Sequence, residues 1–498
     1  MDTVLATQIF RQLFSKPARQ CLHAQARARS SLLRTPTQRR AYALRHREDD
    51  GSGRSNWQQR LDHFPPDITK EIKEYPRVTA AELRHRAQRP RRVKMYTRDF
   101  IDDSLYNPNY GYFSKHATIF TPTQPFDFPS IADEAEFNRL INQNYLDFED
   151  ALDDLAYDPN RQLWHTPTEL FQPHYGHAIA RYLITNYKMS LYPYHDLIIY
   201  EMGAGNGTMM RNILDYIRDT DPSVYARTKF RVIEISSSLH SLQKTSLTTP
   251  ISDPDHLEHV ELINSSIFTW DKPVPHPCFF LALEVIDNFS HDSIRYDPYT
   301  EQAMQGSVLI TEDGEFVEFY EPNIDPLAAR YLKLRRLAAR APFRTPLTSP
   351  PPAIRKFKHS LPLSPNLTQP EYIPVRLMQF FDVLSTYFPH HRLVLADFTS
   401  LPDAVPGINA PVVQTRYERR SIPVPTPFVH QGYFDIFFPT DFGLMEDMYR
   451  LQTGKLTRVR DHSEWLKGWE DDEGATVVRS GEDVMGTFYG NQAVMTTM

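Results

Sequence analysis

The sequence predicts an α/β protein built around a doubly wound, mostly parallel sheet. Short apolar runs of strand length alternate along the chain with segments of helical periodicity, which is the pattern of repeated βαβ units. A glycine-rich turn follows the first of these runs and precedes the first helix between strands. With 498 residues and a hydrophobic content of 41%, the chain has enough apolar side chains for a large core with insertions.

The expected elements of this sheet follow one another from the middle of the chain onward. The expected strands lie at 195–203, 229–236, 259–266, 278–287 and 391–398, with a final strand near 432–438. Helices are expected at 208–219, 238–247, 325–340 and 371–388, with a hairpin at 307–320. Ahead of the sheet, apolar residues at helical spacing predict helices within 93–113 and 168–187.

These patterns divide the chain into five parts. We expect a transit peptide at 1–47, a partly disordered linker at 48–92, a helical cap region at 93–190, the main α/β domain at 191–445 and a C-terminal extension at 446–498. Within the main domain, residues 341–370 are basic and rich in Pro and Ser, which predicts an exposed loop insertion.

The first 47 residues have the composition of a mitochondrial targeting leader. They contain ten Arg or Lys residues and one acid, Asp2, and apolar residues recur at helical spacing in 4–14. No apolar run of the kind found in secretory signals follows, and acidic residues return abruptly at 48–50. We therefore expect import into the mitochondrial matrix, the alternative being a disordered basic tail.

Composition argues against several classes of protein. A formal net charge of −7 argues against a general nucleic-acid-binding protein, and no apolar stretch approaches the ~20 residues that span a bilayer. Two cysteines, Cys21 and Cys278, cannot form a disulfide framework. His165, His174 and His177 lack nearby cysteines or acids at ligand spacing, so no metal site is predicted. No feature of the sequence points to a particular oligomeric state.

The segment YEMGAGNGTMM at 200–210 places three glycines at alternate positions. Glycines let the backbone approach a ligand closely, and the helix expected to begin at Thr208 presents free N–H groups there. A dinucleotide requires the spacing G-x-G-x-x-G, whereas Gly203, Gly205 and Gly207 follow G-x-G-x-G. The tighter spacing favours S-adenosylmethionine, which has no diphosphate to be bound. A dinucleotide site and an ordinary glycine turn are the alternatives.

Acidic and polar residues after the predicted strands suit the same cofactor. Glu234 ends the second strand, where its carboxylate can accept both ribose hydroxyls, farther from Gly203 than the ~20 residues usual in dehydrogenases. Glu201 can fix the glycine loop or bind the cofactor ammonium. Asn264 and Ser265, after the third strand, are candidates for contact with the adenine. A surface salt bridge for Glu234 and a structural role for Glu201 are the alternatives.

Five stretches between 93 and 298 form an ordered set of motifs. They are MYTRDFIDDSLYNPNYGYF (95–113), ELFQPHYGHAIARYL (169–183), YEMGAGNGTMMRNIL (200–214), RVIEISSSLHSLQ (231–243) and LALEVIDNFSHD (281–292). Together they resemble the motifs of the MidA family of mitochondrial methyltransferases. The likeness is weaker near 371–445.

The resemblance implies a Rossmann-like class I methyltransferase fold with a seven-stranded, mostly parallel sheet. It implies S-adenosylmethionine as cofactor, a mitochondrial matrix address and a protein substrate. The implied activity is that of a protein arginine methyltransferase, by symmetric dimethylation of an arginine on a complex I subunit, in support of respiratory complex I assembly.

The chain departs from the family's pattern at three places. Leu283 replaces the Asn of an Asn-Glu pair, Ser290 replaces a Pro, and the late Ile-Asp-Tyr-Gly strand reads LADFTS at 395–400. These departures leave open a second hypothesis, a catalytically silent methyltransferase fold that serves as an assembly scaffold. An NAD-dependent oxidoreductase is the third.

Glu284 and Asp287 are the predicted catalytic residues on the substrate side. Methyl transfer to nitrogen is a direct displacement, so the protein mainly supplies alignment and charge. A guanidinium acceptor would be held by carboxylates in bidentate pairs. Both residues leave the fourth predicted strand at the carboxyl edge of the sheet, where open α/β sheets bind ligands. The alternative is that Asp287 caps a following helix and Glu284 pairs with a structural arginine.

Overall fold

The computed structural model describes residues 68–115, 117–248, 254–348, 351–362, 364–402, 404–470 and 474–498. The predicted transit peptide at 1–47, and the predicted linker as far as residue 67, lie outside these residues. In the ranges that the structure describes, no helix combines the length and the apolar character needed to cross a membrane.

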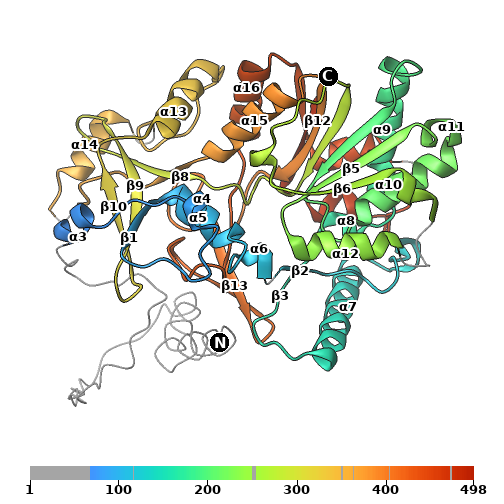
Figure 1. Cartoon of the computed structure of the whole chain (residues 1–498), viewed down its shortest axis with the longest axis horizontal. Coiled ribbons are helices and arrows are strands. Elements are labelled where there is room, and N and C mark those ends of the chain that lie inside the picture. The colour runs from blue at the N-terminus through green and yellow to red at the C-terminus, as the bar shows by residue number, and fades with distance from the viewer. Residues whose placement is uncertain are drawn as a thin grey trace.

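A seven-stranded sheet occupies the right half of Figure 1, in the order β16-β17-β12-β7-β4-β5-β6. Its strands are β4 (Leu197–Met202), β5 (Thr228–Glu234), β6 (Val260–Asn264), β7 (Cys278–Leu283), β12 (His391–Phe398), β16 (Thr457–Asp461) and β17 (Gln492–Thr497). The strands from β6 to β12 pair in parallel. Strand β17 is antiparallel to both of its neighbours, so β16 runs in the same direction as β12. Six strands therefore end at the same edge.

Helices cover both faces of this sheet, which is why its central strands β4 and β7 are continuous buried runs rather than alternating ones. Ile199 and Phe279 lie in the core cluster of one face, and Tyr200 and Phe280 lie in that of the other. The first face is covered by α9 (His174–Ser190), α10 (Thr208–Thr220), α17 (His462–Lys467) and α18 (Val484–Phe488). The second is covered by α15 (Val375–Tyr387), α16 (Phe442–Thr453) and the short 3-10 helix η3 (Ile267–Thr269). The remaining connections on this side of the molecule contain α11 (Pro222–Tyr225), α12 (Ser237–Thr248) and η2 (Pro254–Glu258).

A second sheet, antiparallel throughout, lies on the left of Figure 1. Its order is β1-β9-β8-β11, with β10 also paired to β9. Its strands are β1 (Val93–Tyr96), β8 (Asp292–Tyr296), β9 (Ala303–Ile310), β10 (Phe316–Glu321) and β11 (Glu371–Ile373). The hairpin predicted at 307–320 is confirmed as β9 and β10. Strand β1 shows that the region expected to be a helical cap begins with a strand of this sheet.

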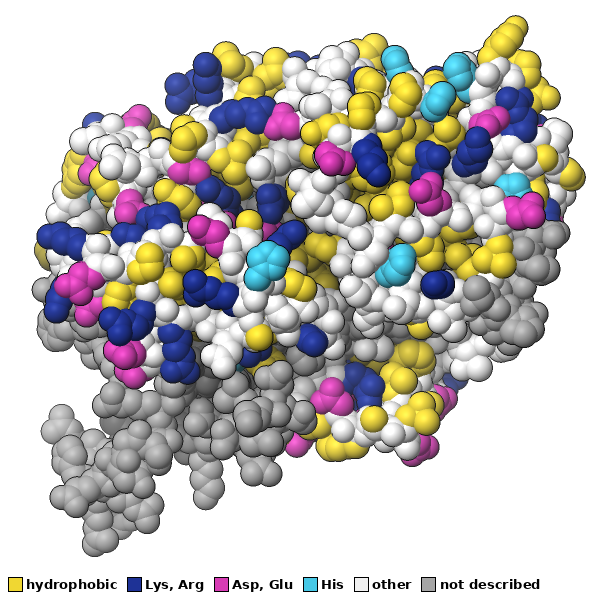
Figure 2. Space-filling model, in the orientation of Figure 1, with side chains coloured by type: hydrophobic (Ala, Val, Ile, Leu, Met, Phe, Trp, Pro, Cys, Tyr) yellow, Lys and Arg dark blue, Asp and Glu magenta, His cyan; other side chains and the backbone are white. Residues whose placement is uncertain are grey.

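Smaller elements connect the two sheets. Strands β2 (Ala117–Ile119) and β3 (Gln162–Trp164) form a parallel pair, and β13 (Val412–Tyr417), β14 (Arg420–Pro423) and β15 (Asp435–Phe437) form an antiparallel sheet. The helices of the N-terminal part are α3 (Thr69–Glu74), α4 (Ala80–Leu83), α5 (Thr97–Tyr106), α6 (Tyr112–Lys115), η1 (Phe128–Ser130), α7 (Glu134–Leu155) and α8 (Pro167–Leu170). Helices α13 (Pro326–Ala338) and α14 (Pro352–His359) lie beside the second sheet (Figure 1). Figure 2 shows basic and acidic side chains interspersed over this face of the molecule.

The α/β prediction is confirmed, with mixed sheets, and three expectations about its parts differ from the structure. Residues 446–498 are more than an extension, because they supply the edge strand β16 of the main sheet and its neighbour β17. The expected loop at 341–370 contains the helix α14. The final strand near 432–438 exists as β15, but it belongs to the small three-stranded sheet. The first and third differences arise from strand pairing with segments elsewhere in the chain.

Replacing Arg335 with methionine is expected to lower the free energy of unfolding by about 3–5 kcal/mol, because it leaves the carboxylate of Glu371 buried without its cation. The side chains of this ion pair are 7% and 0% exposed. Arg330→Met on the same helix is the matched control, since the pair of Arg330 with Asp382 is 46% and 37% exposed. Arg330→Met is expected to lower the free energy of unfolding, measured with urea, by no more than about 1 kcal/mol. Equal losses in the two variants would contradict the prediction.

Candidate active site

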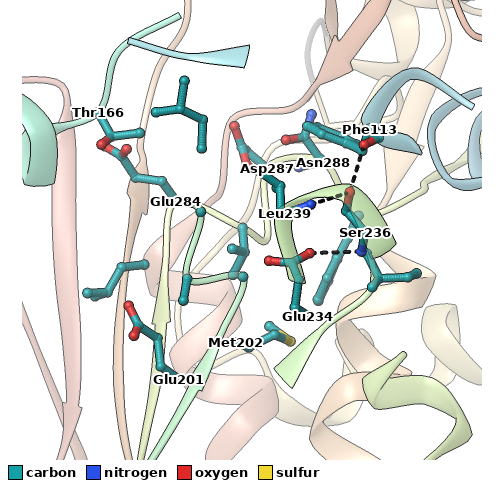
Figure 3. Close-up of a pocket in the computed structure, with 18 of the residues that line it drawn as sticks. Phe113, Thr166, Glu201, Met202, Glu234, Ser236, Leu239, Glu284, Asp287 and Asn288 are labelled. Carbon is teal, nitrogen blue, oxygen red and sulfur yellow. Dashed lines mark hydrogen bonds between the residues drawn. The ribbon is translucent and has the colours of Figure 1, made fainter. Parts of the chain in front are cut away.

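A cavity of about 320 Å³ lies at the carboxyl edge of the main sheet (Figure 3). Its lining includes the ends of β4, β5 and β7 and the loops that follow them, together with Tyr106 of α5, Thr166 before α8 and Asp435 of β15. Of the predicted site residues, the cavity is lined by Glu201, Gly203, Gly205, Glu234, Ser265, Glu284 and Asp287, but not by Gly207 or Asn264.

The turn after β4 depends on glycines at positive φ. Gly203 has a φ of 72° and Gly205 a φ of 55°, a region that side chains disfavour. The N–H of Gly203 donates to the carbonyl oxygen of Ile233 at 3.0 Å, which keeps the turn attached to β5. A Cβ atom on Gly203 would lie 2.6 Å from Cγ1 of Val285, and one on Gly205 would lie 2.7 Å from Cδ1 of Ile119. Close packing and backbone conformation therefore both require glycine here.

Gly207 lies beyond the cavity wall, at the start of α10. Its φ is 80°, and its carbonyl oxygen accepts the N–H of Arg211 at 3.2 Å. A Cβ atom there would lie 3.6 Å from Cε of Met210 and 3.7 Å from Cγ of Gln243, which are ordinary contact distances. The third glycine therefore shapes the entry into the helix rather than the surface of the cavity.

Glu201 and Glu234 place two buried carboxyl groups beside the glycine turn (Figure 3). Burial raises the pKa of Glu201 to about 8, and the charge of Glu234 adds to the rise. Burial also raises the pKa of Glu234 to about 7, although the N–H of Ser236 donates to it at 2.9 Å and Nε2 of Gln243 at 3.3 Å. Oε2 of Glu201 is buried and has no hydrogen-bond partner among the described residues. The site thus contains an acceptor that the protein itself leaves unsatisfied.

Of the two candidates for adenine contact, Ser265 lines the cavity and Asn264 does not. Nδ2 of Asn264 donates to the carbonyl oxygen of Glu234 at 2.8 Å, and its Oδ1 accepts from the hydroxyl of Ser237 at 3.3 Å. Asn264 therefore joins the end of β6 to the loop after β5. Ser265 lines the cavity, and its hydroxyl lies 3.1 Å from that of Thr269.

Glu284 follows β7 in a strained backbone conformation. Its φ of 52° is uncommon for a residue other than glycine, and such strain is concentrated at functional sites. Its N–H donates to the carbonyl oxygen of Ala396 at 2.9 Å, which holds it against β12, and Nε2 of Gln492 in β17 donates to its carboxylate. Burial raises the pKa of Glu284 to about 8, and the negative charge of Asp397 contributes.

Three more carboxyl groups lie near this position: those of Asp287 and Asp397, which are buried residues, and that of Asp435, which is half-buried. Oδ2 of Asp397 accepts the N–H groups of Ile286 and Asp287 at 3.0 and 3.1 Å, so it holds the loop after β7 in place. Nδ2 of Asn288 donates to Oδ1 of Asp435 at 3.0 Å. Burial raises the pKa of Asp397 and of Asp435 to about 7. Burial and then the charge of Asp397 raise the pKa of Asp287 well above its ordinary value.

We call Glu284, Asp287, Asp397 and Asp435 the carboxylate cluster. None of its members forms an ion pair with a described Lys or Arg side chain. No helix follows Asp287, which excludes the capping role considered from the sequence. The cavity lining also contains Arg84 and Arg376, and Arg376 pairs with Asp102. Because the cluster has no counter-ion of its own, it is suited to a cation from outside the protein.

Asp397 and Asp435 were missed by sequence reasoning. A signal existed for Asp397, because it is an acid at the end of a predicted strand, within LADFTS at 395–400. No signal marked Asp435, which reaches the cavity from β15 of the separate three-stranded sheet.

Residues 178–460 match the family model described as "Putative S-adenosyl-L-methionine-dependent methyltransferase". The chain belongs to this methyltransferase family. The matched region contains the glycine turn and every member of the carboxylate cluster. Membership confirms the predicted cofactor, S-adenosylmethionine, and the assignment as a methyltransferase, and it argues against the dinucleotide alternative.

Two curated relatives of this methyltransferase carry the name "Protein arginine methyltransferase NDUFAF7 homolog, mitochondrial". The protein from Schizosaccharomyces pombe is 26% identical over 76% of this chain and 80% of its own length. The protein from Saccharomyces cerevisiae is 21% identical over 60% of this chain and 71% of its own length. These names agree with the MidA resemblance and with the predicted mitochondrial address.

A solved structure shares the fold of this methyltransferase. It is the crystal structure of a protein from Burkholderia thailandensis bound to S-adenosylhomocysteine. Its TM-score to this chain is 0.51, and the two sequences are 13% identical. The likeness covers 88% of this chain and 95% of the bacterial chain. The likeness therefore extends beyond the main sheet.

Proposed function

We propose that the chain is an S-adenosylmethionine-dependent protein arginine methyltransferase of the mitochondrial matrix. In this proposal the main sheet is the seven-stranded, Rossmann-like sheet of class I methyltransferases, since its topology has that strand number and direction. The names of the two fungal relatives support the acceptor type and the compartment. Symmetric dimethylation and a complex I subunit as substrate follow from the MidA resemblance.

The carboxylate cluster carries this proposal. A guanidinium remains positively charged at any physiological pH, and planar carboxylates bind it in bidentate pairs. Glu284 and Asp287 line the same cavity as the glycine turn, so a cation held by them would lie next to the cofactor. Ionisation of the buried acids, which burial opposes, becomes favourable once a fixed positive charge enters.

The residues at the glycine turn fit the cofactor. Because Gly203 and Gly205 have no side chains, the cofactor can lie close to the backbone of the turn. Oε2 of Glu201 is a buried acceptor that receives no hydrogen bond from a described residue. Glu234 ends β5, where a carboxylate can accept the ribose hydroxyls. In this proposal Ser265 contacts the adenine, while Asn264 and Gly207 act indirectly, by holding the loop and the helix entry. S-adenosylmethionine supplies the activated methyl group, and the chain's residues bind and orient the two reactants.

Replacing Gly203 with alanine is expected to weaken binding of S-adenosylmethionine at least tenfold, because the new Cβ would lie 2.6 Å from Val285 and displace the turn. Gly454→Ala is the matched control: its φ of 70° is nearly the same, and nothing lies within 4 Å of its Cβ position. Calorimetric titration of both variants measures the affinity. Unchanged binding by Gly203→Ala would contradict the assignment of the turn.

Transfer of labelled methyl groups tests the activity itself. The protein is incubated with methyl-labelled S-adenosylmethionine and mitochondrial proteins from cells that lack this chain, and the products are hydrolysed to amino acids. We expect label in dimethylarginine, with the symmetric isomer predominant. Cofactor binding without transfer to any protein would favour the catalytically silent scaffold, and label in another amino acid would reject arginine as the acceptor.

A further inference from the structure

Residues 326–370 form a strongly basic segment within the folded part of the protein. They include nine Arg or Lys residues and neither Asp nor Glu, in a chain whose formal net charge is −7. Four of these cations are ion-paired within the fold: Arg330, Arg335, Arg340 and Arg355. The other five are exposed and form no ion pair with a described residue: Lys333, Arg336, Arg344, Lys356 and Lys358.

Arg355 fixes the orientation of α14 within this segment. It is 1% exposed and is the buried residue of the helix. Its guanidinium pairs with Glu301 and donates to the carbonyl oxygens of Pro298 and Leu347. Because these contacts prevent rotation about the helix axis, the remaining sides of α14 stay turned to solvent, at the outer left edge of the molecule in Figure 1.

An apolar stripe runs along the exposed side of α14. Ile354, Phe357 and Leu361 are spaced by three and four residues, so they lie on one side of the helix and of the turn that follows it. These side chains are 57%, 67% and 48% exposed. Lys356 and Lys358 flank the stripe on its two sides. The stripe therefore combines projecting apolar groups with unpaired positive charge.

We propose that α14 docks the protein on an anionic phospholipid surface, with Ile354, Phe357 and Leu361 inserted among the headgroups. Helices with bulky apolar residues on one side and lysines beside them bind in this interfacial position. Lysine side chains can extend their apolar stems along the apolar stripe and keep their ammonium groups at the lipid phosphates. A protein partner is less suited, because unpaired lysines border the stripe and favour an anionic surface.

A fluorescent probe on α14 tests the proposal in the full chain. Phe357→Cys, in a Cys21→Ser background, is labelled with nitrobenzoxadiazole; the remaining cysteine, Cys278, is buried. Tyr194→Cys is the matched control position, since Tyr194 is 87% exposed and lies after α9. We expect vesicles of phosphatidylcholine with phosphatidylglycerol to shift the emission at 357 to shorter wavelength. The control position, and vesicles of phosphatidylcholine alone, should give no shift.

Comparing the probe at 357 with the probe at 194 distinguishes membrane binding by α14 from binding by the basic leader at 1–47, because every variant carries the same leader. Lys356→Gln and Lys358→Gln should each weaken vesicle partitioning reported by the probe by about fivefold. An unchanged emission at 357 with anionic vesicles, or equal shifts at 357 and 194, would overturn the proposal. A shift at 357 caused by soluble mitochondrial proteins but not by vesicles would overturn it in favour of a protein partner.

Discussion

Replacing Glu284 with glutamine is expected to lower the rate of methyl transfer by about 10²–10³-fold, the loss typical of removing one preorganised electrostatic contact. Glutamine preserves the size of the side chain and an oxygen that accepts from Gln492. It removes the negative charge that orients the guanidinium in the proposed function. Affinity for S-adenosylmethionine should stay within a few fold, because the glycine turn keeps its shape. Single-turnover transfer and calorimetric titration measure the two quantities separately.

Glu261→Gln provides the control for this substitution. Glu261 lies on β6 of the same sheet, its side chain is 61% exposed, and it pairs with Arg231 at the surface. Neither transfer nor cofactor affinity should change. If Glu284→Gln transferred methyl groups at the normal rate, the carboxylate cluster would not be the acceptor site. If it lost cofactor affinity instead, Glu284 would belong to the cofactor side.

The ligand-free protein is expected to lose stability as pH rises from about 4 to about 8. Carboxyl groups in an unfolded chain have pKa values near 4. In the fold, burial raises the pKa of Glu201 and Glu284 to about 8, and that of Glu234 to about 7. Between these limits the folded chain binds more protons than the unfolded chain. Each such proton lowers the free energy of unfolding by about 1.4 kcal/mol per pH unit. The stabilisation is complete below pH 4 and lost as pH passes the folded pKa values.

Glu201→Gln removes one of these titrating groups and is expected to flatten the slope by the equivalent of up to one proton, about 1.4 kcal/mol per pH unit. Urea unfolding at a series of pH values measures the slope. Asp221→Asn serves as the control, because a hydrogen bond from Lys188 lowers the pKa of Asp221 to about 2, below the window. Asp221→Asn should change the free energy of unfolding by the same amount at every pH between 5 and 8, and so leave the slope unchanged. A slope that Glu201→Gln leaves unchanged would rule out the titration of Glu201 as its source.

The parallel part of the main sheet could be predicted from the sequence because its strands are local patterns. Strands β4, β5, β6, β7 and β12 are short apolar runs, each separated from the next by helical or loop segments. Their pairing direction follows from the crossover connections. Strands β16 and β17 had no such signal. Residues 457–461 (TRVRD) contain one apolar side chain and residues 492–497 (QAVMTT) contain three. They become strands because β17 pairs with β12 and β16 pairs with β17.

Beyond its β9–β10 hairpin, the second sheet could not be predicted, for a similar reason. β1 pairs with β9, and β11 pairs with β8, across long stretches of sequence. Propensity shows that such short segments can form strands, but it does not show which partner each will meet. Helix α14 was also missed, because its prolines and basic residues resemble a loop, and its orientation depends on the contacts of Arg355.

The sequence by itself determined the family, the cofactor and one side of the site. Gly203, Gly205, Glu201, Glu234 and Glu284 each lie at the end of a parallel strand, so local pattern and strand direction were enough to bring them to one edge.

Only the tertiary structure decided how the acidic residues act together. Asp397 of β12 and Gln492 of β17 act on Glu284, and Asp435 of β15 bonds to Asn288 in the loop after β7. These strands come together with β7 or its loop only after folding. Their raised pKa values depend on burial, which is a property of the whole fold and not of any segment. The cluster of unpaired carboxyl groups, and with it the proposed preference for a cationic acceptor, is therefore a consequence of long-range packing.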